Sequence, residues 1–115
     1  MIDDEDLLRR ASAQMLERAG HTVLTAVDGA EGLACFEENA DRIDVVILDH
    51  MMPVLNGDQV LSRLQNRRAD VRVLMVSGFI EGQDARIPES GDQVRFLRKP
   101  YSRRELLDAL SRLSN

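Results

Sequence analysis

The chain has 115 residues, of which 43% are hydrophobic, and it carries a formal net charge of −5. This length is typical of one domain with a real hydrophobic core, so residues 1–115 are treated as a single domain. The net negative charge argues against nucleic acid as a partner of this domain. Cys35 is the only cysteine, which excludes an intramolecular disulfide. No apolar run approaches the ~20 residues that span a membrane.

The first half of the chain alternates between helical and strand-like patterns. Apolar residues at spacings of three and four predict a helix from about Asp4 to a left-handed cap at Gly20. We expect its buried stripe to consist of Leu8, Ala11, Met15 and Ala19, widened by Leu7 and Leu16. The composition then predicts a strand at 22–27, a break at Asp28-Gly29, a helix at 30–39 and a buried strand at 43–48.

The second half continues the alternation. A loop is expected at 52–57, followed by a helix at 58–67, a strand at 71–76 and a strand at 94–98. The polar stretch 81–92 contains two glycines and a proline, so it predicts at best a short or broken helix. Ser102 and Glu105 have the spacing of a capping box, which places the start of a last helix at that point.

Alternating strands and helices predict an α/β fold, a doubly wound parallel sheet with right-handed crossovers and helices on both faces. In strand order 2-1-3-4-5 the first strand lies inside the sheet, yet only Met1 and Ile2 precede Asp3. The first strand is therefore largely missing from this chain. We expect the natural polypeptide to extend upstream with an apolar strand.

Charged and hydroxyl side chains follow several of these strands. Asp3 and Asp4 come at the first strand position, Asp49 follows 43–48, Ser77 follows 71–76, and Lys99 follows 94–98. The carboxyl ends of parallel strands meet at one edge of a sheet, so these groups should converge there. Two carboxylates ~4 Å apart repel by about 4 kcal/mol at an effective dielectric of 20. Oxygen ligands of this kind suit Mg²⁺, a carboxylate can act as a nucleophile towards phosphorus, and a lysine suits phosphate oxygens.

At this point the chain resembles the receiver domains of two-component response regulators over essentially its whole length. The resemblance rests on four stretches: Ile2-Asp3-Asp4-Glu5, Leu48-Asp49-His50-Met51-Met52-Pro53-Val54-Leu55-Asn56-Gly57, Val76-Ser77-Gly78 and Phe96-Leu97-Arg98-Lys99-Pro100-Tyr101. It implies the flavodoxin-like version of the predicted sheet.

The resemblance also implies roles for the acidic residues. Asp49 would be the phosphoacceptor, and Lys99 would pair with the phosphoryl group. Mg²⁺ would be bound by Asp49, directly by Asp4, mostly through water by Asp3, and by the main-chain carbonyl of Met51.

Further roles follow from the same resemblance. Ser77 would move to bind the attached phosphoryl group, and Phe96 stands at the switch aromatic position, where it lacks a tyrosine hydroxyl. The Lys99-Pro100 bond would be cis, a form found almost only before proline.

As a receiver domain, the chain would take its phosphoryl group from a histidine kinase or a histidine phosphotransfer domain and then change its affinity for a partner. It would not be an enzyme as an isolated domain, and it would act in the bacterial cytoplasm without binding nucleic acid or membrane itself. The local sequences Val76-Ser77-Gly78-Phe79 and 96–102 most resemble those of receivers at the C-terminus of hybrid histidine kinases. Dimerisation stays open.

Three alternatives compete with this interpretation. A pseudo-receiver would use the same fold as a phosphorylation-independent binding module. The presence of all of Asp3, Asp4, Asp49, Ser77 and Lys99 argues against a pseudo-receiver. A haloacid-dehalogenase-like phosphatase needs an Asp-x-Asp pair, and Asp49-His50-Met51 lacks the second aspartate. A flavin-binding flavodoxin would need a phosphate loop rich in Ser, Thr and Gly after the first strand position.

Overall fold

A parallel sheet forms the centre of the protein in the computed structural model, which describes residues 1–50, 56–77 and 93–114. The sheet contains β1 (Val46–Asp49), β2 (Val73–Ser77) and β3 (Val94–Arg98), which lie side by side in that order. β1 and β2 are buried along nearly their whole length, in keeping with their apolar sequences up to the polar last residues Asp49 and Ser77.

Ile2 extends this sheet beyond β1 on the side away from β2. It forms parallel bridges to Leu48 and to Ala26. Its amide donates to the Ile47 carbonyl at 2.8 Å, and its carbonyl accepts from the Asp49 amide at 2.9 Å. The extended segments thus follow the predicted order 2-1-3-4-5, with a single residue bridging at the first position.

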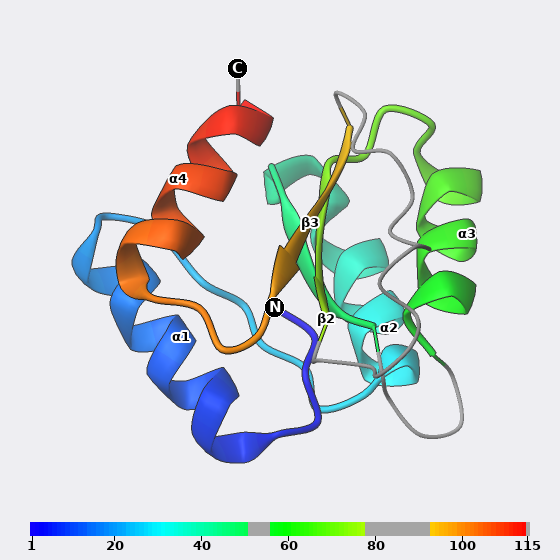
Figure 1. The fold of residues 1–115 in the computed structure, drawn as a ribbon. Helices are drawn as coiled ribbons and strands as arrows, with labels where there is room; N and C mark the ends of the chain where they lie inside the picture. The colour runs from blue at the N-terminus through cyan, green and yellow to red at the C-terminus, as the bar shows by residue number, and fades with distance from the viewer. Residues whose placement is uncertain (51–55, 78–92, 115) are drawn as a thin grey trace, which may run out of the picture.

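The helices cover both faces of the sheet. α1 (Asp6–Arg18) and α4 (Arg103–Ser114) pack on one face, and α2 (Gly29–Asn39) and α3 (Gly57–Arg67) pack on the other (Figure 1). A short 3₁₀ helix, η1 (Ala40–Arg42), follows α2.

Alternating residues of the strands separate the core into two apolar clusters. Val46, Leu48, Val73 and Met75 point towards the α2 and α3 face, whereas Ile47, Leu74 and Val76 point towards α1 and α4. Both faces of the central strands are therefore covered, and only the ends of the strands remain available for chemistry.

Local sequence signals define most of the helix ends. The Asp28 side chain accepts from the Glu31 amide, and Asn56 and Gln59 form a reciprocal capping box at α3. The predicted capping box at α4 is confirmed, since Ser102 Oγ accepts from the Glu105 amide at 3.1 Å and the Glu105 side chain accepts from the Ser102 amide at 3.0 Å. Gly20 follows α1 with φ of 98°, as expected for a left-handed cap.

The predicted buried stripe of α1 is confirmed at Leu16 but is wrong for most of its other members. The buried residues are Arg9, Ser12 and Leu16, whereas Leu8 and Met15 are half-buried and Ala11 and Ala19 are exposed. Leu7, which we expected at the edge of the stripe, is 87% exposed. The helix is rotated relative to its apolar pattern because Arg9 and Ser12 find polar partners inside the fold.

Several strand bounds also differ from the prediction. β1 and β2 both begin and end later than expected, so Asp49 and Ser77 are the last residues of their strands. The expected strand at 22–27 is reduced to a bridge at Ala26, whose backbone forms hydrogen bonds with Met1 and Asp3. The short or broken helix predicted at 81–92 lies outside the described residues.

A cavity of about 640 Å³ lies beside Met1 and Ile2, between residues 22–26 and residues 42–47. The upstream apolar strand stays a prediction.

Ile2 is positioned by a close contact with a glycine of α2. A Cβ atom on Gly32 would clash with the Ile2 side chain, which would have to shift to make room for it. Gly32→Ala should lower the free energy of unfolding by about 1–2 kcal/mol through overpacking, despite the better helix propensity of alanine. Urea denaturation measures this change, and the penalty should shrink in an Ile2→Val background. An equal penalty in both backgrounds would contradict the contact.

Candidate functional site: an acidic cluster around a lysine

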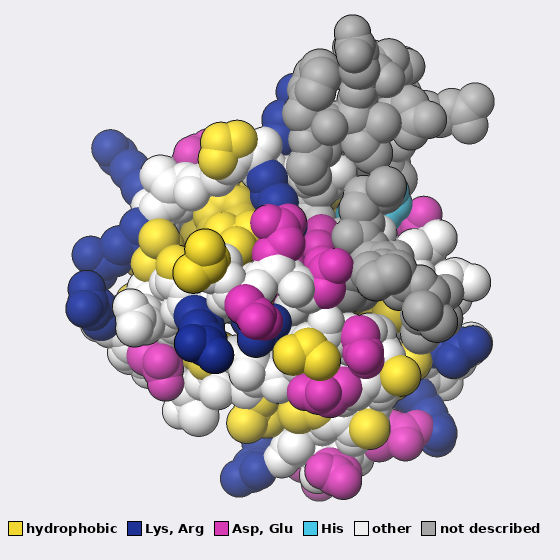
Figure 2. Space-filling model, turned by 90° about the horizontal axis from the view of Figure 1, so that it is seen from below, with side chains coloured by type: hydrophobic (Ala, Val, Ile, Leu, Met, Phe, Trp, Pro, Cys, Tyr) yellow, Lys and Arg dark blue, Asp and Glu magenta, His cyan; other side chains and the backbone are white. Residues whose placement is uncertain are grey.

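Three aspartates meet at the carboxyl edge of the sheet. Asp49 ends β1, and Asp3 and Asp4 follow Ile2 on the neighbouring position of the sheet. One carboxylate oxygen from each of the three lies within 4.8 Å of the other two. Asp3 and Asp49 are 1% and 3% exposed, whereas Asp4 is open to solvent. Acidic side chains gather near the middle of this edge (Figure 2).

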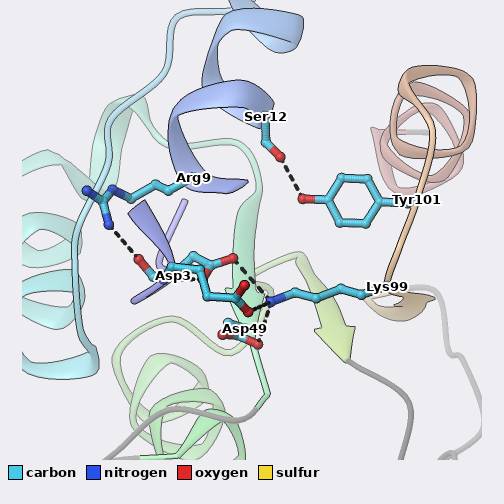
Figure 3. Close-up of polar contacts among 7 residues, drawn as sticks. Asp3, Arg9, Ser12, Asp49, Lys99 and Tyr101 are labelled. Carbon is cyan, nitrogen blue, oxygen red and sulfur yellow. Dashed lines mark hydrogen bonds and ion pairs between the residues drawn. The ribbon is translucent and has the colours of Figure 1, made fainter. Parts of the chain in front are cut away.

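The Lys99 ammonium group lies against this cluster. Its Nζ is 3.3 Å from Asp49 Oδ1 and 3.4 Å from Asp3 Oδ2, and its side chain is 12% exposed. In Figure 3 the lysine reaches from the end of β3 towards both carboxylates. The two buried negative charges therefore share one positive charge, as the order of the strands predicts.

The charge of Lys99 is secured by its neighbours. Burial would lower the pKa of Lys99, but the hydrogen bond to Glu5 and the charges of Asp49 and Asp3 outweigh burial and raise the pKa to about 12. The ammonium group is thus protonated throughout the neutral pH range and is ready to pair with an anion.

Arg9 of α1 fixes the backbone that carries Asp3. Its guanidinium donates to the Asp3 carbonyl at 3.0 Å and to Asp6 Oδ1 at 2.6 Å. The Glu5 amide in turn donates to Asp3 Oδ1 at 2.8 Å. These bonds hold both the main chain and the carboxylate of Asp3 where α1 begins.

Contacts from the last third of the chain hold the Lys99 side of the site. The Lys99 amide donates to the Ser77 carbonyl at 2.7 Å, and the Lys99-Pro100 bond is cis, as predicted. Tyr101 then forms a 2.7 Å hydrogen bond through its hydroxyl with Oγ of the buried Ser12 on α1 (Figure 3). Burial raises the pKa of Tyr101, so its hydroxyl stays neutral in this contact near pH 7.

A close backbone contact supports Asp49 from behind. A Cβ atom on Gly57 would lie 2.7 Å from His50 Cα and 2.9 Å from the Asp49 carbonyl oxygen, so a larger residue would displace that backbone. The Gly57 amide donates to the His50 carbonyl at 2.9 Å, and the His50 ring meets Asp58 Oδ2 at 3.0 Å. The start of α3 is thus packed directly against the end of β1.

The structure brings together Asp3, Asp4, Asp49 and Lys99, as the sequence predicts. Ser77 ends β2 at the same edge of the sheet and is half-buried. Phe96 lies in the middle of β3, opposite Met75, and its ring is half-buried against the α2 and α3 cluster. Met51, the predicted carbonyl ligand, lies outside the described residues.

Sequence reasoning missed the residues that support this cluster. It did not assign the contacts of Arg9, the hydrogen bond between Ser12 and Tyr101, or the contact between Glu5 and Lys99. One signal was present: Arg9, Ser12 and Leu16 share one face of the helix by their spacing. A buried polar stripe of this kind points to partners inside the fold.

A family model described as the response regulator receiver domain matches residues 1–111. The chain belongs to the response regulator receiver family. Solved structures agree: a receiver domain protein from Clostridium thermocellum is 34% identical with a TM-score of 0.88, covering 99% of this chain and 90% of that one. The receiver domain of the hybrid histidine kinase CckA is 30% identical with a TM-score of 0.83, covering 99% of this chain and 95% of that one. The fold is therefore the flavodoxin-like one.

Curated relatives include proteins of different lengths. Protein PilG from Pseudomonas aeruginosa is 36% identical over 115 residues, which is 96% of this chain and 82% of PilG. The sensor kinase CckA from Brucella abortus is 33% identical over 106 residues, which is 92% of this chain but 11% of the kinase. The likeness to CckA supports the predicted resemblance to receivers of hybrid kinases. Among the described residues, no helix is long and apolar enough to cross a membrane.

Receiver domains in general bind Mg²⁺ at an acidic pocket, and the donor set here fits that ion. The three carboxylates supply only oxygen atoms, which Mg²⁺ prefers. Oδ2 of the buried Asp3 accepts no hydrogen bond from the described residues and has Lys99 as its charge partner. An anionic oxygen in this situation is suited to a nearby cation.

The contacts of Arg9 make it a support of the cluster. Arg9→Ala should lower the free energy of unfolding by about 2–3 kcal/mol, because it removes two charge-assisted hydrogen bonds from a largely buried group. It should also weaken Mg²⁺ binding, since Asp3 loses its anchor. Urea denaturation and Mg²⁺ titration measure the two effects. Arg10→Ala, on the exposed side of the same helix, is the matched control, and equal losses in the two variants would refute the assigned role.

Proposed function

We propose that this receiver domain accepts a phosphoryl group on Asp49 from a phosphohistidine of a partner, and that Mg²⁺ takes part. The supporting observation is the arrangement of Lys99, whose ammonium lies 3.3 Å from Asp49 and 3.4 Å from Asp3 while it remains charged. Phosphoryl transfer depends mainly on positioning and on charge neutralisation, which is what this group of residues offers.

In the proposed step, a carboxylate oxygen of Asp49 attacks the phosphorus of the phosphohistidine in line with the leaving nitrogen. A P–O bond forms and the P–N bond breaks, and its electron pair returns to the imidazole, which takes up a proton. The product is an aspartyl phosphate on Asp49 and a free histidine on the partner.

The residues around Asp49 divide the remaining work. Lys99 pairs with the phosphoryl oxygens. Asp3, Asp4 and Asp49, with the Met51 carbonyl, would hold Mg²⁺, which supplies positive charge against the carboxylates and the phosphoryl oxygens. Hydrolysis by water then breaks the P–O bond, releases phosphate and restores the Asp49 carboxylate.

Switching would follow from the new phosphoryl group. Its oxygens attract the Ser77 hydroxyl, and Phe96 moves into the space that Ser77 leaves. The surface around β3 and α4 then changes its affinity for a partner, which is a shift between two populated states of the domain. The donor is a histidine kinase or a histidine phosphotransfer domain in the bacterial cytoplasm. The domain could itself be part of a larger hybrid histidine kinase. The domain itself is not an enzyme in this proposal.

Incubation of the purified chain with acetyl phosphate and Mg²⁺ tests the proposal. Intact mass spectrometry should show one added phosphoryl group in the wild type and none in Asp49→Asn, because an amide lacks the nucleophilic carboxylate. Circular dichroism on both samples verifies folding. A folded wild type without an adduct would overturn the proposal and favour a phosphorylation-independent binding module.

Lys99→Ala tests the division of roles between the lysine and the aspartates. The variant should still bind Mg²⁺, since its oxygen ligands remain, but its phosphorylation by acetyl phosphate should slow by about 10²-fold without the positive charge. Magnesium titration and mass spectrometry measure these two quantities. Arg103→Ala, at the exposed start of α4, serves as the control for loss of a positive charge elsewhere. Complete loss of Mg²⁺ binding in Lys99→Ala would mean that the assigned roles are wrong.

A further inference from the structure

Lys99 has a third acidic neighbour besides Asp3 and Asp49. Glu5 Oε1 lies 3.0 Å from Lys99 Nζ, closer than Asp49 Oδ1 at 3.3 Å or Asp3 Oδ2 at 3.4 Å. This contact has the geometry of a hydrogen bond and joins residues 94 positions apart in the chain. The ammonium group is therefore shared among three carboxylates.

Glu5 differs from the two aspartates in its surroundings. Its side chain is 61% exposed, whereas those of Asp3 and Asp49 are 1% and 3% exposed. An exposed pair contributes only about 0–1 kcal/mol, so Glu5 can leave Lys99 for water at small cost. Asp3 and Asp49 have no such freedom, because they would have to remain charged in a buried place.

The backbone of Glu5 is fixed while its carboxylate is not used locally. Glu5 stands at the N-cap of α1, a position that favours serine, threonine, aspartate or asparagine, and its side chain makes no capping hydrogen bond. Its amide is held by Asp3 Oδ1 at 2.8 Å. The carboxylate thus extends from an anchored backbone to Lys99 instead of capping the helix.

We propose that Glu5 is a displaceable counter-ion of Lys99, a residue that acts through Lys99 by competing for its ammonium group and that gives way to phosphoryl oxygens. An arriving phosphoryl group brings negative charge to a site that already contains the carboxylates of Asp3, Asp49 and Glu5. The exposed Glu5 is the one that moves into water, and Lys99 exchanges this contact for a phosphoryl oxygen. Glu5 thereby competes modestly with the phosphoryl oxygens for Lys99. The inference rests on the proposed phosphorylation of Asp49.

Glu5→Gln keeps the size of the side chain and removes its charge. Phosphorylation by acetyl phosphate should become about threefold to fivefold faster, because one charged competitor for Lys99 and one repelling charge are gone. Magnesium affinity should fall modestly, since the site has lost a negative charge. Glu5→Ser, which supplies a preferred N-cap residue, should show the same two changes with the helix start preserved. Opposite shifts in the two quantities are not expected from a simple loss of structure.

Two further variants decide whether Glu5 acts through Lys99. Glu17→Gln removes an exposed charge near the other end of α1 and should leave both quantities unchanged. In a Lys99→Ala background, Glu5→Gln should lose most of its accelerating effect. An adduct on the wild type with an equal or slower rate in Glu5→Gln would overturn this inference while leaving the proposed function intact. Absence of any adduct on the folded wild type would overturn the proposed function as well.

Discussion

The rest of the structure depends on one electrostatic constraint: two buried aspartates share the charge of a single lysine. Asp3 and Asp49 are almost inaccessible to solvent, and Lys99 is the cation that contacts both among the described residues. Buried charges are tolerated only where they are paired, so the geometry of this trio has to be maintained accurately. Any shift of the strands that carry these residues would separate opposite charges in a poorly solvated place.

Contacts from several elements maintain the geometry of Asp3, Asp49 and Lys99. Arg9 holds the Asp3 main chain, and Gly57 lets α3 approach the backbone of Asp49. Gly32 makes room for Ile2, whose bridges to both neighbouring segments align Asp3 with Asp49. At this edge of the sheet, two glycines and the buried Arg9 guanidinium thus hold the backbone in place, as longer strand pairing does in the centre of the sheet. The fold and the site share the same contacts, so substitutions at these supports should affect both stability and ion binding.

The sequence predicted the fold and the convergence of Asp3, Asp49 and Lys99 because both follow from regular patterns. Apolar runs marked β1 and β2, and the polar residues at their ends marked the active edge. The rotation of α1 could not be predicted in the same way, because Arg9 and Ser12 are buried by partners far away in the sequence. Periodicity describes apolar burial and does not describe hydrogen bonds across the fold. The same reason explains why the contact of Glu5 with Lys99 went unpredicted: an acidic residue before a helix is equally consistent with a solvated turn.

The hydrogen bond between Ser12 and Tyr101 joins residues 89 positions apart, and Lys99 meets Asp3 across a similar separation. Contacts of this kind close long loops, and the entropy cost of closing them has to be offset by the rest of the fold. The acidic cluster consequently requires that segments from both ends of the fold, around Asp3 and around Lys99, are in place together. A partly unfolded chain has its aspartates and its lysine apart, so the proposed phosphoryl chemistry would require the completed fold.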